Sequence, residues 1–139
     1  MVDIDHFKKF NDNHGHQAGD QVLRQFCDLC RSTIREYDLF ARYGGEEFVI
    51  VLPQTDAETA NEVAEKLRSV IASHSFSIER EHYHLTASFG VADLKPVRDG
   101  FGKNELISRA DEALYAAKKK GRNNVVVYSQ KKKWFGRTP

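Results

Sequence analysis

A pair of glycines between two β-rich runs constrains this chain more than any other stretch of its sequence. The runs cover residues 39–43 and 48–52, and Gly44-Gly45-Glu46-Glu47 lies between them. Glycines in this position are typical of a tight hairpin turn. The hairpin would carry two carboxylates at its tip, and its glycines would leave the backbone open to a ligand that a Cβ atom would push away. The alternative is a surface turn whose glutamates are merely solvated.

The length and the charge balance exclude several classes of protein. The 139 residues predict one domain with a real hydrophobic core. The 21 Lys and Arg residues nearly balance the 20 Asp and Glu residues, so the net charge is +1 and no global basic field would attract nucleic acid or a membrane. We expect neither a signal peptide nor a transmembrane segment, because no apolar run is long enough to span a bilayer. Any anion-binding site must therefore be local.

The two cysteines, Cys27 and Cys30, form a C-x-x-C pair of the kind found in redox couples and in halves of zinc sites. They fall in the middle of a helical pattern and have no second Cys or His pair at ligand spacing. We interpret them as buried thiols in a reducing cytosol, with a redox or zinc site as the alternative.

A strand end at the N-terminus is followed by a helical turn and a long helix. Asp5 is placed to cap the helical turn at residues 7–13. Gly15 and Gly19 are expected to break the helical pattern. A long helix then starts at Asp20, whose carboxylate would meet the free backbone N–H groups of its first turn.

The rest of the chain predicts two further helices among short strands. Thr55 and Glu58 have the spacing of a capping box and would start the next helix, and Gly121 would end the last one. Residues 81–83 are expected to turn between two strands, and residues 95–103 to form a loop. The expected strands cover residues 1–5, 39–43, 48–52, 76–78, 85–91 and 125–128, and the long first and last helices cover about 20–35 and 105–120.

This order of elements predicts an α+β or α/β domain with one sheet, and a ferredoxin-like β-α-β-β-α-β core is the most economical topology. In that arrangement the first strand and the hairpin can be neighbours, so Asp3 would meet Glu46 and Glu47. Crowded carboxylates either raise one another's pKa or hold divalent cations, and oxygen ligands suit Mg²⁺. The alternative is that Asp3 merely ends a strand.

Three cations could face these carboxylates. Lys118 and Arg122 are four residues apart near the end of the last helix and can reach one phosphate chain together. Lys8 follows Asp3 closely in sequence and adds a third cation. Alternatively, the lysine run that begins at Lys118 is a solvated face that complements the C-terminus of its helix.

An amide and a carboxylate could bind a base. Asn11 and Asp20 together could hydrogen-bond the N1–H, N2–H₂ and N3 edge of guanine. Judged without a family pattern, they would be turn and cap residues.

Several segments occur in a fixed order and spacing along the chain, namely residues 3–12, 15–20, 42–48, 88–92, 110–118 and 121–123. Together they resemble the GGDEF domains of bacterial diguanylate cyclases, with Gly44-Gly45-Glu46-Glu47-Phe48 as a GGEEF variant of the signature. The resemblance covers nearly all of residues 1–128 and implies a GGDEF domain over residues 1–130. The N-terminal helix and the start of the first strand of such a domain are expected to be missing here. A basic tail over residues 131–139 would be a frayed terminus or, alternatively, a lipid anchor.

The resemblance implies a fold and an activity. The fold would be the α+β, ferredoxin-like fold of nucleotidyl cyclases and polymerase palms, with a central mostly antiparallel sheet, flanking helices and an extra β-hairpin. The activity would be condensation of two GTP molecules into cyclic di-GMP with release of two pyrophosphates, across a homodimer of facing domains. The alternative is a catalytically silent module that binds GTP or cyclic di-GMP. We expect no nucleic-acid partner, a cytoplasmic location, and membrane attachment only through other parts of a parent protein.

The resemblance also implies roles for individual residues. Two Mg²⁺ or Mn²⁺ ions per GTP would be held by Asp3, the Ile4 carbonyl, Glu46 and Glu47, and Glu47 or Glu46 would assist deprotonation of the ribose 3′-hydroxyl. The substrate-binding residues would be Phe7, Lys8, Asn11, His16, Asp20, Gly44, Gly45, Lys118 and Arg122. Arg35 and Asp38 match an R-x-x-D site for feedback inhibition by the product.

Overall fold

The computed structural model describes residues 1–95 and 102–129. Its helices and strands are β1 (Val2–Ile4), α1 (Phe7–His14), α2 (His16–Thr33), β2 (Leu39–Gly44), β3 (Glu47–Val51), α3 (Ala57–Ser73), β4 (Phe76–Ile78), β5 (Glu81–Tyr83), β6 (Ala87–Val91), α5 (Lys103–Lys119) and β7 (Val125–Val127). The basic tail expected at residues 131–139 and most of the loop expected at residues 95–103 lie outside the described residues.

Five strands form one mixed sheet in the order β2-β3-β1-β6-β7. The central strand β1 is antiparallel to both β3 and β6, whereas β7 is parallel to β6. Strands β4 and β5 form a separate hairpin. The first four strands of the sheet reproduce the ferredoxin-like order, so the predicted α+β fold with a mostly antiparallel sheet and an extra hairpin is confirmed.

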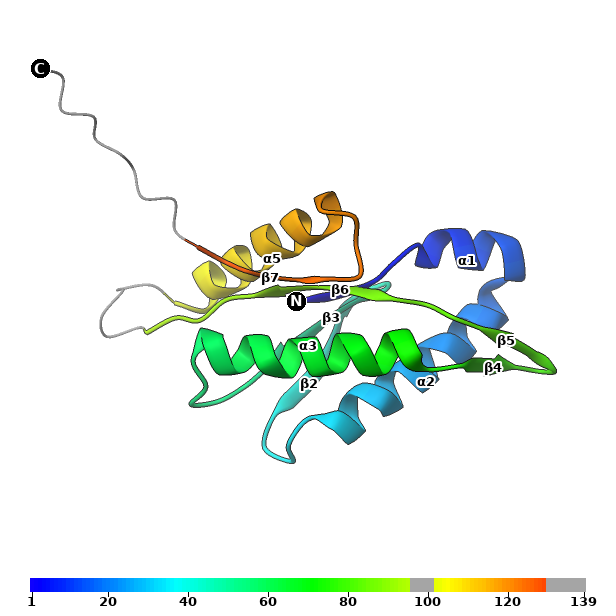
Figure 1. Ribbon diagram of the computed structural model, residues 1–139, viewed down its shortest axis with the longest axis horizontal. Coiled ribbons are helices and arrows are strands. Elements are labelled where there is room, and N and C mark those ends of the chain that lie inside the picture. Colours follow the sequence, from blue (N-terminus) through cyan, green and yellow to red (C-terminus); the bar gives the residue numbers. More distant parts are fainter. Residues whose placement is uncertain (96–101, 130–139) are drawn as a thin grey trace, which may run out of the picture.

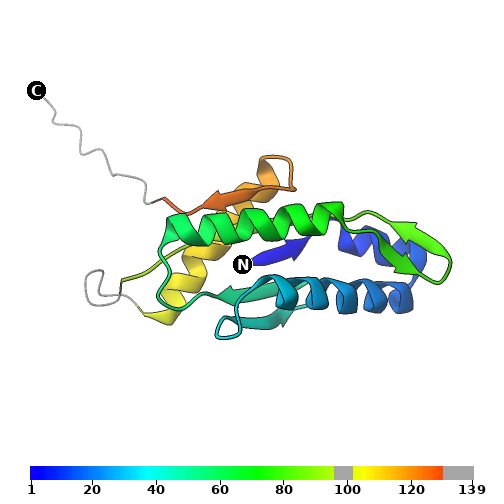
Figure 2. The same ribbon diagram turned by 60° about the horizontal axis from the view of Figure 1, so that its bottom comes forward.

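Helices cover both faces of this sheet. Figures 1 and 2 show α5 on one face, against β6 and β7, and α2 and α3 on the other. Gly90 lets α5 approach β6 closely, since a Cβ atom there would overlap the backbone of Ala110 and Leu114. On the other face Phe26 of α2 packs against Phe48 of β3, with ring centroids 5.0 Å apart. Strand β1 is thereby buried between two helical layers.

The expected start of the long N-terminal helix is wrong. Helix α2 begins at His16, so Gly19 lies inside the helix instead of breaking it, and Asp20 belongs to the second turn and not to the cap. Gly19 is buried, and a Cβ atom at this position would overlap the side chain of Asn11 on α1. This glycine therefore leaves room for the Asn11 side chain between the two helices.

Two expected helix caps are also wrong. The residue that precedes α1 is His6, with φ of 56° and no side-chain capping bond, so Asp5 does not cap this helix. Helix α3 is capped by Asp56, whose carboxylate accepts a hydrogen bond of 2.8 Å from a first-turn N–H. The expected capping box at Thr55 is one residue early, because the Thr55 hydroxyl donates to the carbonyl of Pro53 instead.

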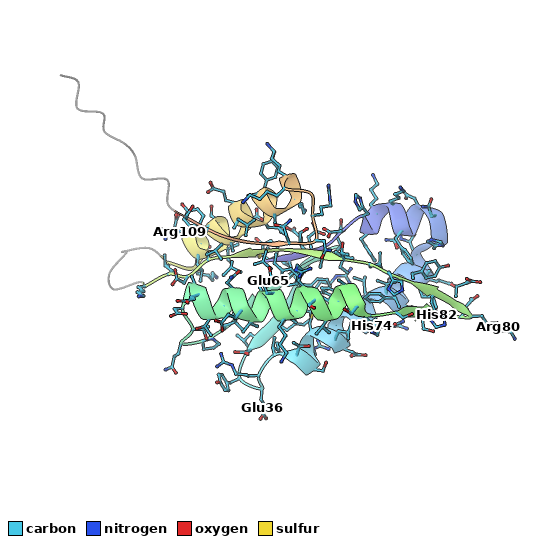
Figure 3. The ribbon with its side chains drawn as sticks, viewed as in Figure 1. Glu36, Glu65, His74, Arg80, His82 and Arg109 are labelled. Atoms are coloured by element: carbon cyan, nitrogen blue, oxygen red, sulfur yellow. The ribbon has the colours of Figure 1, made fainter. Side chains whose placement is uncertain are left out.

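Residues 81–83, expected to be a turn, form strand β5. The chain reverses instead at Glu79 and Arg80, and Glu79 has a left-handed φ of 55°. The side chains of Arg80 and His82 project from this hairpin at the opposite end of the molecule from Arg109 of α5 (Figure 3).

The cysteines are free thiols in α2, and burial raises the pKa of Cys30 to about 12. Burial also raises the pKa of Cys27. A thiol with a raised pKa is a poor nucleophile and a poor metal ligand, which favours the interpretation as buried thiols. Within residues 1–95 and 102–129, no helix has the length and apolar character needed to cross a membrane.

Candidate active site

The strand pairing places the carboxylate of β1 beside the hairpin. Asp3 lies directly opposite Glu47 in the antiparallel pairing of β1 and β3. Residues directly opposite in a ladder present their side chains on the same face of the sheet. The Ile4 backbone N–H donates to the Glu46 carbonyl at 3.3 Å, which brings the turn of the hairpin against the end of β1. The predicted proximity of these acidic residues is confirmed.

Burial disfavours the ionised form of two of these carboxylates. Burial is the largest cause that raises the pKa of Asp3, and Glu46 adds to it although Lys118 opposes it. Burial is also the largest cause that raises the pKa of Glu47, followed by the charges of Asp111 and Asp3. A cation placed among these groups would therefore be favoured.

A polar cavity of about 190 Å³ collects most of the residues expected to bind metal and phosphate. It is lined by Asp3, Ile4, Asp5, His6, Phe7, Lys8, Glu46, Lys118 and Arg122. The Lys118 ammonium donates to the Asp3 carboxylate. In the described part of the chain, the Lys8 ammonium and the Arg122 guanidinium have no hydrogen bond or ion pair. Two of the three expected cations are therefore available to an anion in this cavity.

The residues expected to bind guanine lie on α1 and α2, outside this cavity lining. Asn11 on α1 lies against Gly19 of α2, and its side-chain oxygen is buried with no hydrogen-bond partner among the described residues. Asp20 and His16 are exposed on α2. A buried amide oxygen without a partner is costly, and a ligand that donates to it would remove that cost.

Gly44 and Gly45 at the hairpin tip have no role in packing. A Cβ atom at either position would meet no atom within 4 Å, and neither residue has a left-handed φ. The Arg42 side chain donates to the Gly45 carbonyl at 2.8 Å, which an alanine would also permit. Nothing in the described fold therefore requires glycine here, as expected if this backbone is kept clear for a ligand.

Arg35 and Asp38 lie between α2 and β2, directly before the hairpin. The Arg35 side chain donates to both carboxylate oxygens of Asp38, at 3.2 and 3.3 Å, and to the Thr55 hydroxyl at 3.0 Å. Its guanidinium also lies 4.7 Å from the centre of the Tyr37 ring. The Asp38 bond is the largest cause that raises the pKa of Arg35. This pair forms a second polar site, separate from the cavity.

Comparison with known proteins identifies the family to which this fold and this site belong. The family described as "Diguanylate cyclase, GGDEF domain" matches residues 1–124. The chain belongs to the GGDEF domain family. The response regulator PleD of Caulobacter vibrioides is 43% identical to this GGDEF domain over 128 residues, which cover 91% of this chain and 28% of PleD.

Solved GGDEF domains share the same fold. The GGDEF domain of DgcB from Caulobacter crescentus, in complex with c-di-GMP, is 38% identical with a TM-score of 0.84 and covers 91% of this chain and 74% of that one. The active GGEEF domain of a diguanylate cyclase from Vibrio cholerae is 40% identical with a TM-score of 0.83, over 94% and 81% of the two chains. This chain spans 18 to 39% of the length of five of the curated relatives that it matches.

GGDEF cyclases use divalent metal ions, and the donor set of the cavity fits such an ion. Among the described residues, no three His, Cys, Asp or Glu side chains converge tightly enough to hold a metal by themselves. The cavity offers instead Asp3, Glu46 and the Ile4 carbonyl. Mg²⁺ commonly binds through one or two carboxylates and takes its remaining ligands from water and substrate phosphates. Lys118 compensates the charge of Asp3 in this cavity.

Sequence reasoning missed Asp5 as part of this site. It lines the cavity and bonds to residues of β6 and of the turn after α5, more than 80 positions away in sequence. The pair Thr86 and Ser88 was a signal for this contact. Thr86 directly precedes β6 and Ser88 lies in it, and alternate residues share one face of a strand.

A larger cavity, of about 860 Å³, lies elsewhere in this GGDEF domain, between α3, α5 and the ends of β3 and β6. Its lining is mainly apolar, with residues such as Val49, Val63, Leu67, Leu106 and Ile107. It contains none of the expected metal or phosphate ligands, so its size does not make it the candidate active site.

Proposed function

We propose that this GGDEF domain is a diguanylate cyclase that condenses two GTP molecules into cyclic di-GMP and releases two pyrophosphates. One observation carries the proposal: in a single polar cavity, the buried carboxylate of Asp3 and the hairpin carboxylate of Glu46 face Lys8, Lys118 and Arg122. Such an arrangement of acidic and basic groups suits a nucleoside triphosphate with its divalent cation better than it suits an uncharged ligand.

The acidic residues would hold the metal ions. Asp3, the Ile4 carbonyl, Glu46 and Glu47 would bind two Mg²⁺ or Mn²⁺ ions, which when bound would activate the 3′-hydroxyl and neutralise charge on the phosphates. The raised pKa of Glu47 suits it, with Glu46 as the alternative, to accept the proton of a ribose 3′-hydroxyl.

The basic residues would bind the leaving group. In each half-reaction a bond forms between the 3′-oxygen of one GTP and the α-phosphorus of the other, and the bond to the β-phosphate oxygen breaks. Lys8, Lys118 and Arg122 would hold the β- and γ-phosphates, so the pyrophosphate leaves in contact with three positive charges. Lys118 would exchange its contact with Asp3 for one with phosphate.

The other residues would position the nucleotide. Asn11 and Asp20 would bind the guanine edge, with the buried Asn11 amide as the stronger determinant. The backbone at Phe7 and at the open Gly44-Gly45 turn would lie along the nucleotide, with His16 near it. Positioning of this kind supplies much of the rate of phosphoryl transfer.

Two copies of the domain would be needed for turnover. Each domain has one such cavity, and the product requires that two GTP molecules attack each other, so two cavities must face in a homodimer. Because the chain matches only part of its curated relatives, the signal that promotes this dimer would come from other parts of a longer, cytoplasmic or membrane-anchored protein.

Cyclic di-GMP would also inhibit the enzyme by binding at Arg35 and Asp38. The guanidinium and the adjacent Tyr37 ring offer a phosphate or guanine ligand both charge and a flat surface. Replacement of Arg35 by Ala should weaken inhibition by added product at least tenfold and leave the initial rate unchanged. An equal loss of initial rate would argue against a separate inhibitory site.

The decisive experiment is incubation with GTP and Mg²⁺ over a range of protein concentrations, with the nucleotides separated by chromatography. We expect cyclic di-GMP and pyrophosphate, at a rate that rises more steeply than in proportion to protein concentration, and no product from Asp3→Asn. Calorimetric binding of GTP without turnover at any concentration would reject the cyclase and favour a silent binding module.

A further inference from the structure

Asp5 is a buried carboxylate that joins three segments of the chain. Its Oδ1 accepts a hydrogen bond of 2.6 Å from the Ser88 hydroxyl. Its Oδ2 accepts bonds of 2.7 Å from the Thr86 hydroxyl and 2.9 Å from the backbone N–H of Asn123. The first two partners belong to β6 and the residue before it, and the third lies in the turn between α5 and β7. The residue after β1 is thereby tied directly to that turn.

This turn has an unfavourable backbone conformation. Gly121, Arg122 and Asn123 are consecutive residues with φ of 108°, 65° and 45°, all in the left-handed region. Glycine and asparagine adopt this region more readily than other residues, so the conformational cost falls mainly on Arg122. The turn therefore depends on its contacts.

Side chains outside the cavity supply some of these contacts. Asn124 donates through its amide to the carbonyls of Ala117 and Arg122, both at 2.8 Å. Arg68 of α3 donates to the Asn123 side chain at 3.0 Å and pairs with Glu65, which Figure 3 shows on the same helix. The bond from Asp5 is the contact that comes from the cavity itself.

Arg122 depends on this turn for its place. In residues 1–95 and 102–129 its guanidinium has no hydrogen-bond or ion-pair partner, so only its backbone directs it toward the cavity. We infer that Asp5 is a positioning residue that, through the Asn123 N–H, fixes the turn from which Arg122 reaches the phosphates of GTP. The inference rests on the proposed function, in which Arg122 binds those phosphates.

The role of Asp5 is to accept hydrogen bonds, and its charge is not required. An asparagine in the same place could accept from Thr86 and the Asn123 N–H through its amide oxygen, with its NH₂ toward the Ser88 hydroxyl. Asp5→Asn should therefore keep the turn in place. Asp5→Ala removes all three bonds and should release the turn.

The test measures binding of 3′-deoxy-GTP and 3′-deoxy-GMP by calorimetry with Mg²⁺. Both ligands lack the attacking hydroxyl, and they differ only in the pyrophosphate. We expect Arg122→Ala to weaken binding of the triphosphate about tenfold and leave the monophosphate unchanged, as for loss of a charge-assisted hydrogen bond. Asp5→Ala should weaken the triphosphate about three- to tenfold, again without effect on the monophosphate. The double variant should bind no more weakly than Arg122→Ala alone.

Other results of this binding experiment would contradict either the inference or the proposed function. Effects of Asp5→Ala and Arg122→Ala that multiply in the double variant would overturn the inference, as would equal losses for both ligands. An Arg122→Ala variant that binds both ligands normally would instead reject the phosphate-binding role in the proposed function. Cyclic di-GMP synthesis by the wild-type chain tests that function separately.

Further variants control for folding. Asp93→Ala removes a comparable bond, from the Ala57 N–H to a carboxylate oxygen at 3.1 Å, and should lower the melting temperature without changing the ratio of the two affinities. If Asp5→Ala does not fold, Asp5→Glu keeps the charge but adds a methylene that displaces the turn, so it should show the same selective loss. Asp5→Asn should bind the triphosphate within about threefold of wild type. Normal binding by Asp5→Glu with loss in Asp5→Asn would overturn the geometric role.

Discussion

At the phosphate end of the proposed site Lys118 is paired with Asp3 within the protein, whereas at the guanine end the Asn11 amide oxygen is buried without a partner. A nucleotide bound as proposed would therefore displace an existing ion pair at one end and would satisfy an unpaired group at the other. At the phosphate end the acidic residues lie on β1 and the hairpin, and the cations come from α1, α5 and the turn after α5, whereas the guanine end lies on α1 and α2. We expect binding strength to depend on charge at the first end and on close packing at the second.

The glycines at the two ends of the site differ in the space around them. Gly44 and Gly45 have open space where a side chain would be, whereas a side chain at Gly19 would overlap Asn11. Because the space at the hairpin tip is open, a methyl group there would not touch the rest of the protein and could affect only a bound ligand. A methyl group at Gly19 would instead force the side-chain amide of Asn11 to move.

The largest effect is expected at the phosphate end, from Glu47→Gln. Cyclic di-GMP synthesis should fall at least about 100-fold, as for loss of a general base or metal ligand. The free energy of unfolding should nevertheless rise, by less than about 1 kcal/mol at pH 7, because burial, Asp111 and Asp3 disfavour the ionised carboxylate in the folded state. Turnover assays and thermal unfolding without metal measure the two quantities.

The pH dependence of that stability gain checks its origin. The folded-state pKa of Glu47 lies above its ordinary value, so the ionised group destabilises the fold at neutral pH. The advantage of Gln should shrink as the pH falls through the raised pKa and disappear below the ordinary pKa of a glutamate, where both states are protonated. Glu58→Gln, in the first turn of α3, should leave activity unchanged and lower the stability slightly, because it removes a negative charge near a helix N-terminus. A lower stability for Glu47→Gln at pH 7 would contradict the assignment.

How much of this site the sequence predicts depends on whether its residues are related by a local pattern or by contacts between distant segments. Strand alternation and a short hairpin fix which residues lie opposite one another, so the meeting of Asp3 with Glu46 and Glu47 could be predicted. The nearness of Lys118 and Arg122 in sequence also predicted that they meet, although α5 ends at Lys119 and Arg122 lies in the turn after it. These residues were found because their relation is local or follows from one strand pairing.

The wrong expectations concern contacts that leave no local pattern. A glycine can end a helix or permit a close helix crossing, and only the position of Asn11 on α1 shows which applies to Gly19. An aspartate before a helix suggests a cap, but Asp5 bonds to residues that only the folded sheet brings near. Both errors arose where tertiary packing overrode a local preference.

The next effect in size is expected at the guanine end, from Gly19→Ala. The new methyl group would force the Asn11 side chain out of its place, so the preference for GTP over ATP should fall about tenfold, as for loss of a hydrogen bond to the base. Unfolding free energy should change by less than about 1 kcal/mol, since alanine favours the helix by a similar amount. Competition binding and thermal unfolding measure both.

Asn11→Ala provides the matched control for this change. It should produce the same loss of preference, and the double variant no further loss, because both changes remove one amide from one place. A selectivity loss in Gly19→Ala that adds to that of Asn11→Ala would mean that Gly19 acts on something other than Asn11.

The smallest effect is expected from Gly45→Ala at the hairpin tip. Because a Cβ atom there meets nothing within 4 Å and the backbone is not left-handed, the melting temperature should stay the same or rise slightly. The KM for GTP should still increase about three- to tenfold, because the methyl group would occupy space that the nucleotide needs. Gly90→Ala is the contrasting control. Its methyl group would overlap the backbone of α5, so it should lower the melting temperature by several degrees. If Gly45→Ala destabilised the fold while KM stayed constant, the hairpin glycines would serve the turn itself, and the proposed approach of the nucleotide to this backbone would have to be abandoned.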